Sequence, residues 1–181
     1  MLRFLENTLK KVNNIMQNIY LIGMPGCGKS ALGKEVAKRL NMEFVDTDKL
    51  VLDKVDAESI NELFKRQGVA NFRKLEKDCV YELSKKENML VSTGGGAVLD
   101  PENVNAMINS GSVVFVDVSI KTLTERIDTS SRPLVSDIGP ALEKLYFNRY
   151  DIYKRSCTKT FDNNGSLEES VEKFVELFQG K

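Results

Sequence analysis

The sequence predicts an α/β fold in which a five-stranded parallel sheet is flanked by helices on both faces. Short runs of β-branched or aromatic residues alternate with longer segments of helical period, which is typical of such a sheet. The 181 residues, of which 41% are hydrophobic, suffice for one domain with a filled core but not for two. A glycine-rich turn joins the first run to the first helical segment, where open parallel sheets bind their ligands.

Five runs are expected as strands, at residues 18–22, 43–45, 89–92, 113–118 and 159–161. Between them, apolar residues recur every three or four positions and predict helices with one buried face each. These faces are Leu32, Val36 and Leu40; Phe72, Leu75, Cys79 and Leu83; and Val171, Phe174, Val175 and Phe178.

Capping signals mark three helix starts, and two segments fall outside the alternating pattern. The capping signals are Ser59 with Glu62, Ser166 with Glu169, and Asp100 followed by Pro101. Residues 1–17 are expected to be an N-terminal extension and residues 18–181 a single domain. Within that domain, residues 128–140 are rich in Ser, Pro, Gly and Asp and predict a mobile loop.

The composition excludes several classes of function. Because 26 Lys and Arg residues balance 26 Asp and Glu, we expect neither nucleic acid nor membrane as a partner. Three separated cysteines argue against a disulfide framework or a zinc site and favour a reducing cytoplasm. No apolar stretch is long enough to span a membrane, and no signal peptide is visible. The absence of histidine leaves catalysis to carboxylates, Lys, Arg and backbone groups.

The strongest motif is segment 23–30, Gly-Met-Pro-Gly-Cys-Gly-Lys-Ser, which follows the first expected strand. It matches the GxxxxGK[ST] phosphate-binding loop, with the strand and helix that this motif requires on either side. Its backbone N–H groups and the helix N-terminus favour phosphate, Lys29 is expected to reach the β- and γ-phosphates, and Ser30 to offer its hydroxyl to Mg²⁺. The expected nucleotide contacts are Gly26, Cys27, Gly28, Lys29, Ser30 and Ala31.

Two alternatives stay open for this segment. It could be a tight strand-to-helix turn that is merely rich in glycine. Cys27 could be a thiol whose modification blocks nucleotide binding, or a small residue that fills the loop.

Asp46 and Asp48 end the second expected strand, and the carboxyl ends of parallel strands face the ligand. If the strand geometry persists, a spacing of two puts both carboxylates on one side. One could then lie near Mg²⁺ while the other orients or deprotonates an attacking hydroxyl. The alternative is that Asp48 is the N-cap of a helix from Lys49. Asp117 also ends a strand, but ranks second to Asp46 as the acidic group.

Three arginines and a glycine turn are further candidates. Arg149 lies on an apolar stripe, so it requires either an anionic ligand or a buried carboxylate. Arg73, near the start of its helix, could bind a ligand or be solvated. Arg132 could close over the phosphates from the loop, or be solvated there. The three glycines 94–96 either let backbone approach a ligand or form a flexible turn.

Taken together, these motifs resemble the shikimate kinase family in order and spacing. They are the phosphate-binding loop, Phe44-Val45-Asp46-Thr47-Asp48, Phe72-Arg73-Lys74-Leu75-Glu76, Gly94-Gly95-Gly96, Arg132-Pro133-Leu134, and Arg149 with Tyr153. The resemblance implies a P-loop fold like that of nucleoside monophosphate kinases. It also implies that the enzyme phosphorylates shikimate with ATP to give 3-phosphoshikimate, in the route to aromatic amino acids.

The resemblance also implies residue roles. Asp48 would hold the attacking hydroxyl, Arg73 and Arg149 would bind the carboxylate, and Gly95 and Gly96 would contact ring hydroxyls. Ser30 and Asp46 would hold Mg²⁺, Lys29 and Arg132 would act on the phosphates, and Arg126 is the candidate neighbour of adenine. We expect a monomer.

Two rival functions remain at this point. A gluconate or nucleotide kinase would share the loop but use other acceptor contacts. A non-catalytic nucleotide-binding module would lack turnover with any acceptor.

Overall fold

A computed structural model describes residues 17–128 and 135–179 of the chain. Its sheet contains the five expected strands, all parallel, in the order β2-β3-β1-β4-β5. The strands are β1 (Asn18–Ile22), β2 (Glu43–Asp46), β3 (Met89–Ser92), β4 (Gly111–Asp117) and β5 (Lys159–Asp162). The predicted fold class is therefore confirmed, with strand ends that move by one or two residues.

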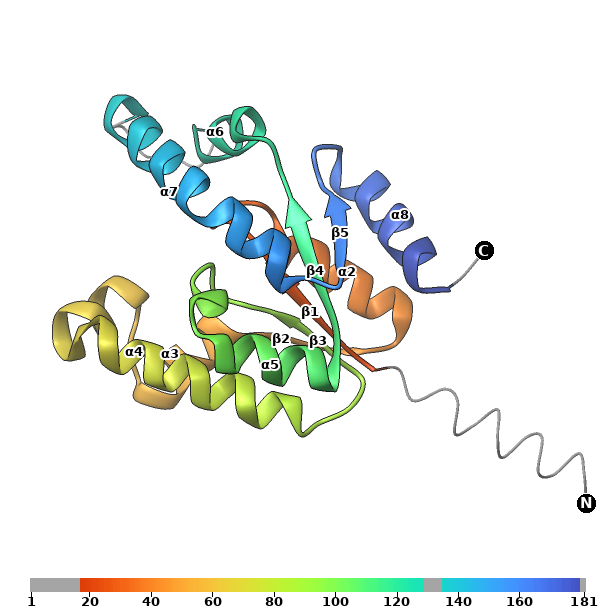
Figure 1. Ribbon diagram of the computed structural model, residues 1–181, viewed down its shortest axis with the longest axis horizontal. Coiled ribbons are helices and arrows are strands. Elements are labelled where there is room, and N and C mark those ends of the chain that lie inside the picture. Colours follow the sequence, from red (N-terminus) through yellow and green to blue (C-terminus); the bar gives the residue numbers. More distant parts are fainter. Residues whose placement is uncertain (1–16, 129–134, 180–181) are drawn as a thin grey trace, which may run out of the picture.

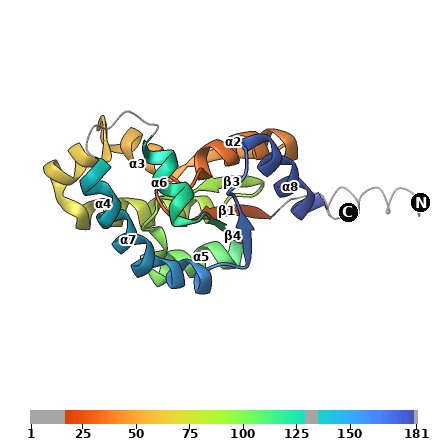
Figure 2. The same cartoon turned by 90° about the horizontal axis from the view of Figure 1, so that it is seen from above.

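Helices cover both faces of this sheet (Figure 1). They are α2 (Lys29–Leu40), α3 (Thr47–Val55), α4 (Ile60–Ser84), α5 (Pro101–Ser110), α6 (Ile120–Asp128), α7 (Val135–Ser156) and α8 (Leu167–Gln179), with a short 3₁₀ turn η1 (Ala97–Leu99). Seen from above, α2 and α8 lie on one side of the sheet, and α5 and α7 on the other (Figure 2). None of the helices in the described ranges has the length and apolar character needed to cross a bilayer.

The central strands form the core because both of their faces are covered. All five side chains of β1 are buried, as are those of β3. The three predicted helix faces pack inward as expected: Leu40, Leu75 and Phe178 are partly buried and the other members are buried. Near-continuous apolar strands are typical of a sheet that is covered on both sides.

Three capping predictions hold. The backbone N–H of Glu62 donates to Ser59 Oγ (3.1 Å) and that of Glu102 to Asp100 Oδ1 (2.9 Å). Ser166 and Glu169 form both bonds of the capping box, each 3.3 Å long.

The expectation of a loop over 128–140 is wrong for residues 135–140. Helix α7 begins at Val135 and continues through Pro140, so the second half of this stretch is helical. Composition misled here: Pro140 removes one hydrogen bond of α7 and crowds the preceding turn, but the helix continues past it to Ser156. Residues 129–134, with Arg132, and the N-terminal residues 1–16 lie outside the described residues.

Candidate active site

The strand order brings three separate motifs to one edge of the sheet. Strands β2, β3 and β1 are neighbours, and their carboxyl ends lead into α3, into the glycine turn 94–96 and into the phosphate-binding loop. In open parallel sheets, this is the edge where ligands bind. The parallel topology therefore places motifs that are far apart in the sequence close together in space.

The phosphate-binding loop has the backbone conformation that its glycines predict. Gly26 and Gly28 have φ of 81° and 94°, values that residues with a Cβ rarely adopt. Helix α2 starts directly afterwards, and its N-cap, Gly28, has no side chain to fill the space before the first turn. The N-terminal N–H groups of α2 are left for an anion.

Lys29 lies folded against its own loop. Its Nζ donates to the carbonyl oxygens of Gly23 (3.0 Å) and Met24 (2.9 Å) and lies 3.6 Å from Cys27 Sγ. The side chain is buried, as is that of Cys27. A buried ammonium needs such acceptors, which phosphate oxygens can replace.

Ser30 and Asp46 meet across the crevice. Ser30 Oγ donates to Asp46 Oδ2 (2.5 Å) and lies 3.1 Å from Ser92 Oγ. A hydroxyl and a carboxylate are oxygen ligands of the kind that Mg²⁺ uses together with substrate phosphates. Because Ser30 and Asp46 supply oxygen ligands at the start of α2, beside the phosphate-binding loop, the residues present fit Mg²⁺. No cluster of three or more His, Cys, Asp or Glu that could hold a metal occurs in the described ranges.

Asp117, the second-ranked acid, has different partners. Its Oδ2 accepts a hydrogen bond from Tyr150 Oη (3.0 Å) and lies 3.7 Å from Lys154 Nζ. Both partners come from α7, so this carboxylate ties α7 to the end of β4.

The expectation that extended geometry persists from Asp46 to Asp48 is wrong. Helix α3 begins at Thr47, and Asp46 itself is the N-cap: its Oδ1 accepts from the N–H groups of Asp48 (3.1 Å) and Lys49 (3.3 Å). The alternative, with Asp48 as the cap, is therefore wrong as well. The cap turns the chain so that Asp48 points from the first helical turn toward Gly94.

Asp48 and Glu76 converge on Gly94. A Cβ on Gly94 would lie 2.5 Å from both Asp48 Oδ1 and Glu76 Oε1, so only glycine fits between the two carboxylates. Both oxygens are buried and have no hydrogen-bond partner among the described residues. Burial raises the pKa of each carboxyl. For Asp48 the charge of Asp46 adds to this increase, and for Glu76 the Arg73 guanidinium opposes it.

Arg73 is bound to Glu76 rather than merely solvated. Its Nη1 lies 2.6 Å from Glu76 Oε2, and the side chains are 34% and 1% exposed. The guanidinium also lies against the space where Gly96 would carry a Cβ, and Pro25 of the phosphate-binding loop fills that space at Gly95. The glycine turn therefore lies directly between the loop and Arg73.

We expect Glu76→Gln to raise the thermal unfolding midpoint at pH 7 by a few degrees, given that ~1 kcal/mol corresponds to about 2–4 °C for a chain of this size. Because the pKa of Glu76 is raised in the folded state, the folded protein is more stable when Glu76 is protonated. This stability is lost as pH rises through the folded-state pKa. Glutamine cannot ionise, so this loss of stability does not occur in the variant. Arg73, which is about one-third exposed, stays hydrated without a charged partner. Melting curves should therefore converge with wild type as pH falls toward 4.

The matched control for this prediction is Glu82→Gln on the same helix. The hydrogen bond from Lys54 lowers the pKa of Glu82, so its contribution has the opposite sign and is present at pH 7. A midpoint that falls in both variants would contradict the assignment of Glu76 as a destabilising buried charge.

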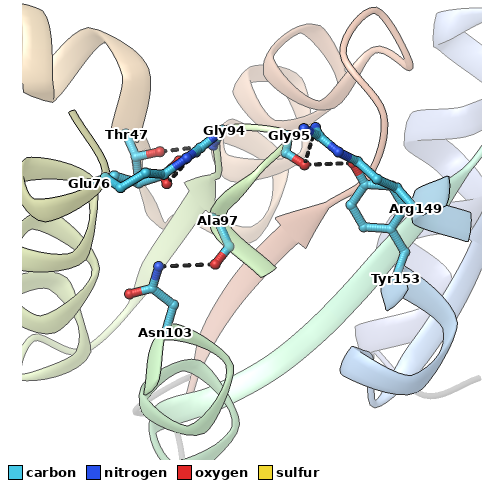
Figure 3. A network of polar contacts seen from close by, with 9 residues as sticks. Thr47, Glu76, Gly94, Gly95, Ala97, Asn103, Arg149 and Tyr153 are labelled. Atoms are coloured by element: carbon cyan, nitrogen blue, oxygen red, sulfur yellow. Dashed lines mark hydrogen bonds and ion pairs between the residues drawn. The ribbon is translucent and has the colours of Figure 1, made fainter. Parts of the chain in front are cut away.

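Arg149 and Tyr153 reach the glycine turn from the opposite side (Figure 3). Arg149 Nη1 and Tyr153 Oη both donate to the carbonyl oxygen of Gly95, at 3.1 and 2.6 Å. Of the two partners left open for Arg149, no buried carboxylate hydrogen-bonds to it within the described residues, although its charge lowers the pKa of the buried Glu76 carboxyl against the effect of burial. The N–H groups of Gly95 and Gly96 have no hydrogen-bond acceptor in the described part of the chain.

Arg126 lies on the other side of the phosphate-binding loop. Its guanidinium donates to the carbonyl oxygens of Cys27 (3.2 Å), Asn163 (2.7 Å) and Gly165 (3.2 Å). The buried Asn163 side chain also donates to Cys27 O (2.8 Å). Arg126 and Asn163, which follows β5, thus both contact the phosphate-binding loop at the carbonyl oxygen of Cys27. Ala31 is exposed in the first turn of α2.

Sequence reasoning gave several residues of this site no role. They are Thr47, Glu76, Ser92, Asn103, Tyr153 and Asn163, each of which bonds to a predicted site segment or to its neighbour. One signal was available for Glu76, because it lies one helical turn after Arg73.

Comparisons with known proteins agree with this geometry. The sequence model of the family described as shikimate kinase matches residues 25–179. A shikimate kinase of Clostridium botulinum (strain Alaska E43 / Type E3) is 38% identical over 88% of this chain and 95% of its own length. A crystal structure of shikimate kinase from Bacteroides thetaiotaomicron superimposes with a TM-score of 0.82 and 30% identity, covering 91% of this chain and 99% of that one.

A second solved structure is the shikimate kinase of Acinetobacter baumannii in complex with shikimate. It has a TM-score of 0.82 and 26% identity, with 93% of this chain and 96% of that chain covered. Because the family model and the curated relative both span most of the sequence, this chain belongs to the shikimate kinase family.

Proposed function

We propose that this enzyme transfers the γ-phosphoryl group of ATP to the 3-hydroxyl of shikimate, giving 3-phosphoshikimate and ADP. The observation that carries the proposal is the glycine turn 94–96, which lies between the phosphate-binding loop, the Asp48 carboxylate and two guanidinium groups. A hydroxylated carboxylic acid matches these groups: a base for the hydroxyl and cations for the carboxylate. The family membership supports the same substrate.

Asp48 is the proposed base. The acceptor oxygen attacks the γ-phosphorus, the bond from that phosphorus to the β–γ bridging oxygen breaks, and the hydroxyl proton passes to Asp48. A raised pKa brings this carboxyl closer to the working pH, which favours proton transfer. Asp48 is also partly shielded from water beside Gly94, so it holds a hydroxyl in one orientation.

The nucleotide is held by Gly26, Cys27, Gly28, Lys29, Ser30 and Ala31. Lys29 exchanges the carbonyls of Gly23 and Met24 for β- and γ-phosphate oxygens, which keeps its buried charge paired. Arg132 acts on the transferred phosphoryl group, and Arg126 lies beside adenine.

Ser30 and Asp46 would hold Mg²⁺, which the oxygen ligands and their short contact support. When bound, the ion neutralises charge on the phosphate oxygens. We further propose that the enzyme is a cytoplasmic monomer, with residues 18–181 as its kinase domain and residues 1–17 as an extension.

ADP release from Mg-ATP in a coupled assay tests the proposed function. Shikimate, gluconate and nucleoside monophosphates are compared as acceptors at equal concentration. Turnover with shikimate alone is expected. Turnover with another acceptor would show that the enzyme is a kinase for a different substrate. No turnover with any acceptor would favour a non-catalytic nucleotide-binding module.

Arg73→Ala and Arg149→Ala are expected to raise KM for shikimate by about 10- to 100-fold, since a lost hydrogen bond to a charged group costs ~1.5–3 kcal/mol. KM for ATP should change little, because neither guanidinium bonds to the phosphate-binding loop. Steady-state kinetics with each substrate varied in turn measures both values.

Arg39→Ala is the control for the arginine variants. Arg39 lies in the last turn of α2 and pairs with Glu172 on the surface, far along the helix from the crevice. Equal changes in both KM values for Arg73→Ala or Arg149→Ala would assign those arginines to folding instead.

A further inference from the structure

Within the part of the chain that the structure describes, the carbonyl oxygen of Gly95 is the acceptor of the glycine turn that two side chains of one helix share. Arg149 and Tyr153 are four residues apart on α7, so they lie on one helical face. Tyr153 Oη is the closer donor, at 2.6 Å against 3.1 Å for Arg149 Nη1. The two donors differ in what else they can do, because only the arginine carries charge.

Tyr153 is fixed in place by its surroundings. Its side chain is fully buried, and its ring stacks on that of Phe115 in β4, with centroids 5.3 Å apart and an interplanar angle of 19°. Burial raises the pKa of its hydroxyl to about 12, so this group remains a donor at any physiological pH. Tyr153 therefore offers Gly95 a hydrogen bond that does not depend on ligand.

Arg149 is less constrained. Its side chain is half-buried. It donates to Gly95 O and also interacts with the neighbouring Tyr153 hydroxyl, where its charge opposes the rise in pKa that burial causes. If Arg149 binds the carboxylate of shikimate, as the proposed function requires, its guanidinium turns from a carbonyl toward a stronger, charged acceptor. The Gly95 carbonyl would then lose one of its two donors at the moment of binding.

We infer that Tyr153 is a positioning residue that holds the Gly95 carbonyl when Arg149 turns to the acceptor carboxylate. The inference rests on the proposed function of Arg149. Tyr153 keeps the turn in place, so the N–H groups of Gly95 and Gly96 stay directed at the acceptor. Without it, a partly buried acceptor would be left unsatisfied whenever substrate binds, and binding would be weakened by that penalty.

Other contacts hold the rest of the turn independently of substrate (Figure 3). Gly94 N donates to Thr47 Oγ1 and Asn103 Nδ2 donates to Ala97 O, each at 3.0 Å, and both side chains are buried. Of these contacts, the one at Gly95 involves Arg149, which is also the residue proposed to bind the substrate. The effect of losing Tyr153 should therefore be specific to the acceptor.

Tyr153→Phe tests the inference because it removes the hydroxyl and keeps the stacked ring. We expect the Kd and KM for shikimate to rise about tenfold, equivalent to ~1.4 kcal/mol and within the penalty for an unsatisfied acceptor. KM for ATP should stay within twofold. Calorimetric titration of shikimate without nucleotide measures the Kd directly.

Tyr150→Phe is the matched control, one turn earlier on α7. Tyr150 also packs against Phe115, but its hydroxyl donates to Asp117. Its Kd for shikimate should equal that of wild type. If Tyr150→Phe and Tyr153→Phe weaken binding equally, loosening of α7 explains both results and the inference is overturned.

A double-mutant cycle with Arg149→Ala separates positioning from a purely structural role. Without Arg149, nothing is exchanged on binding, so adding Tyr153→Phe should leave the already weakened Kd unchanged while the unfolding midpoint falls further. Additive losses of affinity would overturn the inference. If wild type does not bind shikimate, the proposed function is wrong. If wild type binds shikimate and Tyr153→Phe binds it equally well, the proposed function stands and the inference is wrong.

Discussion

Replacing Asp48 with alanine is expected to lower kcat by about 10²–10⁴-fold, the usual contribution of a positioned acid–base group. The expectation rests on the convergence of Asp48, Glu76 and Gly94, and on an Asp48 oxygen that is buried without a partner among the described residues. An acceptor hydroxyl would supply that partner. ATP binding should survive, because Asp48 bonds to no residue of the phosphate-binding loop.

Single-turnover kinetics together with nucleotide titration measure these two effects separately. Asp53→Ala is the control, since Asp53 lies on the same helix with an exposed side chain. Near-normal turnover by Asp48→Ala would remove Asp48 from the mechanism.

The pH profile offers a second check on Asp48. Because burial raises its pKa, the base is lost at a higher pH than an ordinary aspartate would be. The acid limb of kcat/KM for wild type should therefore lie above the usual aspartate range, with activity falling as pH decreases through it. A limb at the ordinary value would contradict the assignment.

Replacing Lys29 with methionine is expected to lower kcat by about 10²–10³-fold, as does the loss of one preorganised group that stabilises transition-state charge. Methionine keeps an apolar stem of similar length in this buried position, so the loop should retain its shape. What is lost is the ammonium, which in the structure already lies against the loop carbonyls that phosphate oxygens would replace.

Lys34→Met, on the exposed face of the same helix, controls for loss of positive charge near the site. Circular dichroism and the unfolding midpoint verify that the loop variant folds. Retention of more than a tenth of wild-type kcat in Lys29→Met would show that the helix N-terminus and backbone N–H groups suffice for phosphoryl transfer.

Much of the fold followed from local pattern. The strands 18–22 and 89–92 were predicted to the residue because both are short apolar runs in the middle of the sheet, where burial on both faces leaves little choice. The phosphate-binding loop was equally clear, since its chemistry requires fixed glycine positions. The 128–140 stretch was less clear, because composition indicated a loop where α7 already begins.

The roles of polar residues depended on contacts between distant segments. Asp46 and Asp48 looked equivalent in sequence, but the helix cap at Asp46 gives them different partners. Asp46 bonds to Ser30, whereas Asp48 lies beside Gly94. A cap is a local device, yet which of two aspartates adopts it depends on where the strand ends. That end is fixed by pairing with β3, 46 residues later.

The sequence by itself determined the fold class, the glycine-rich turn between β1 and α2 and the family resemblance, because periodicity, glycine spacing and motif order are local properties of the chain. Only the tertiary structure decided which side chains share the glycine turn. Asp48, Glu76, Arg149 and Tyr153 come from three helices, and their contacts exist because parallel strands end at one edge and leave no room for a Cβ at Gly94. No spacing along the chain encodes such close approach.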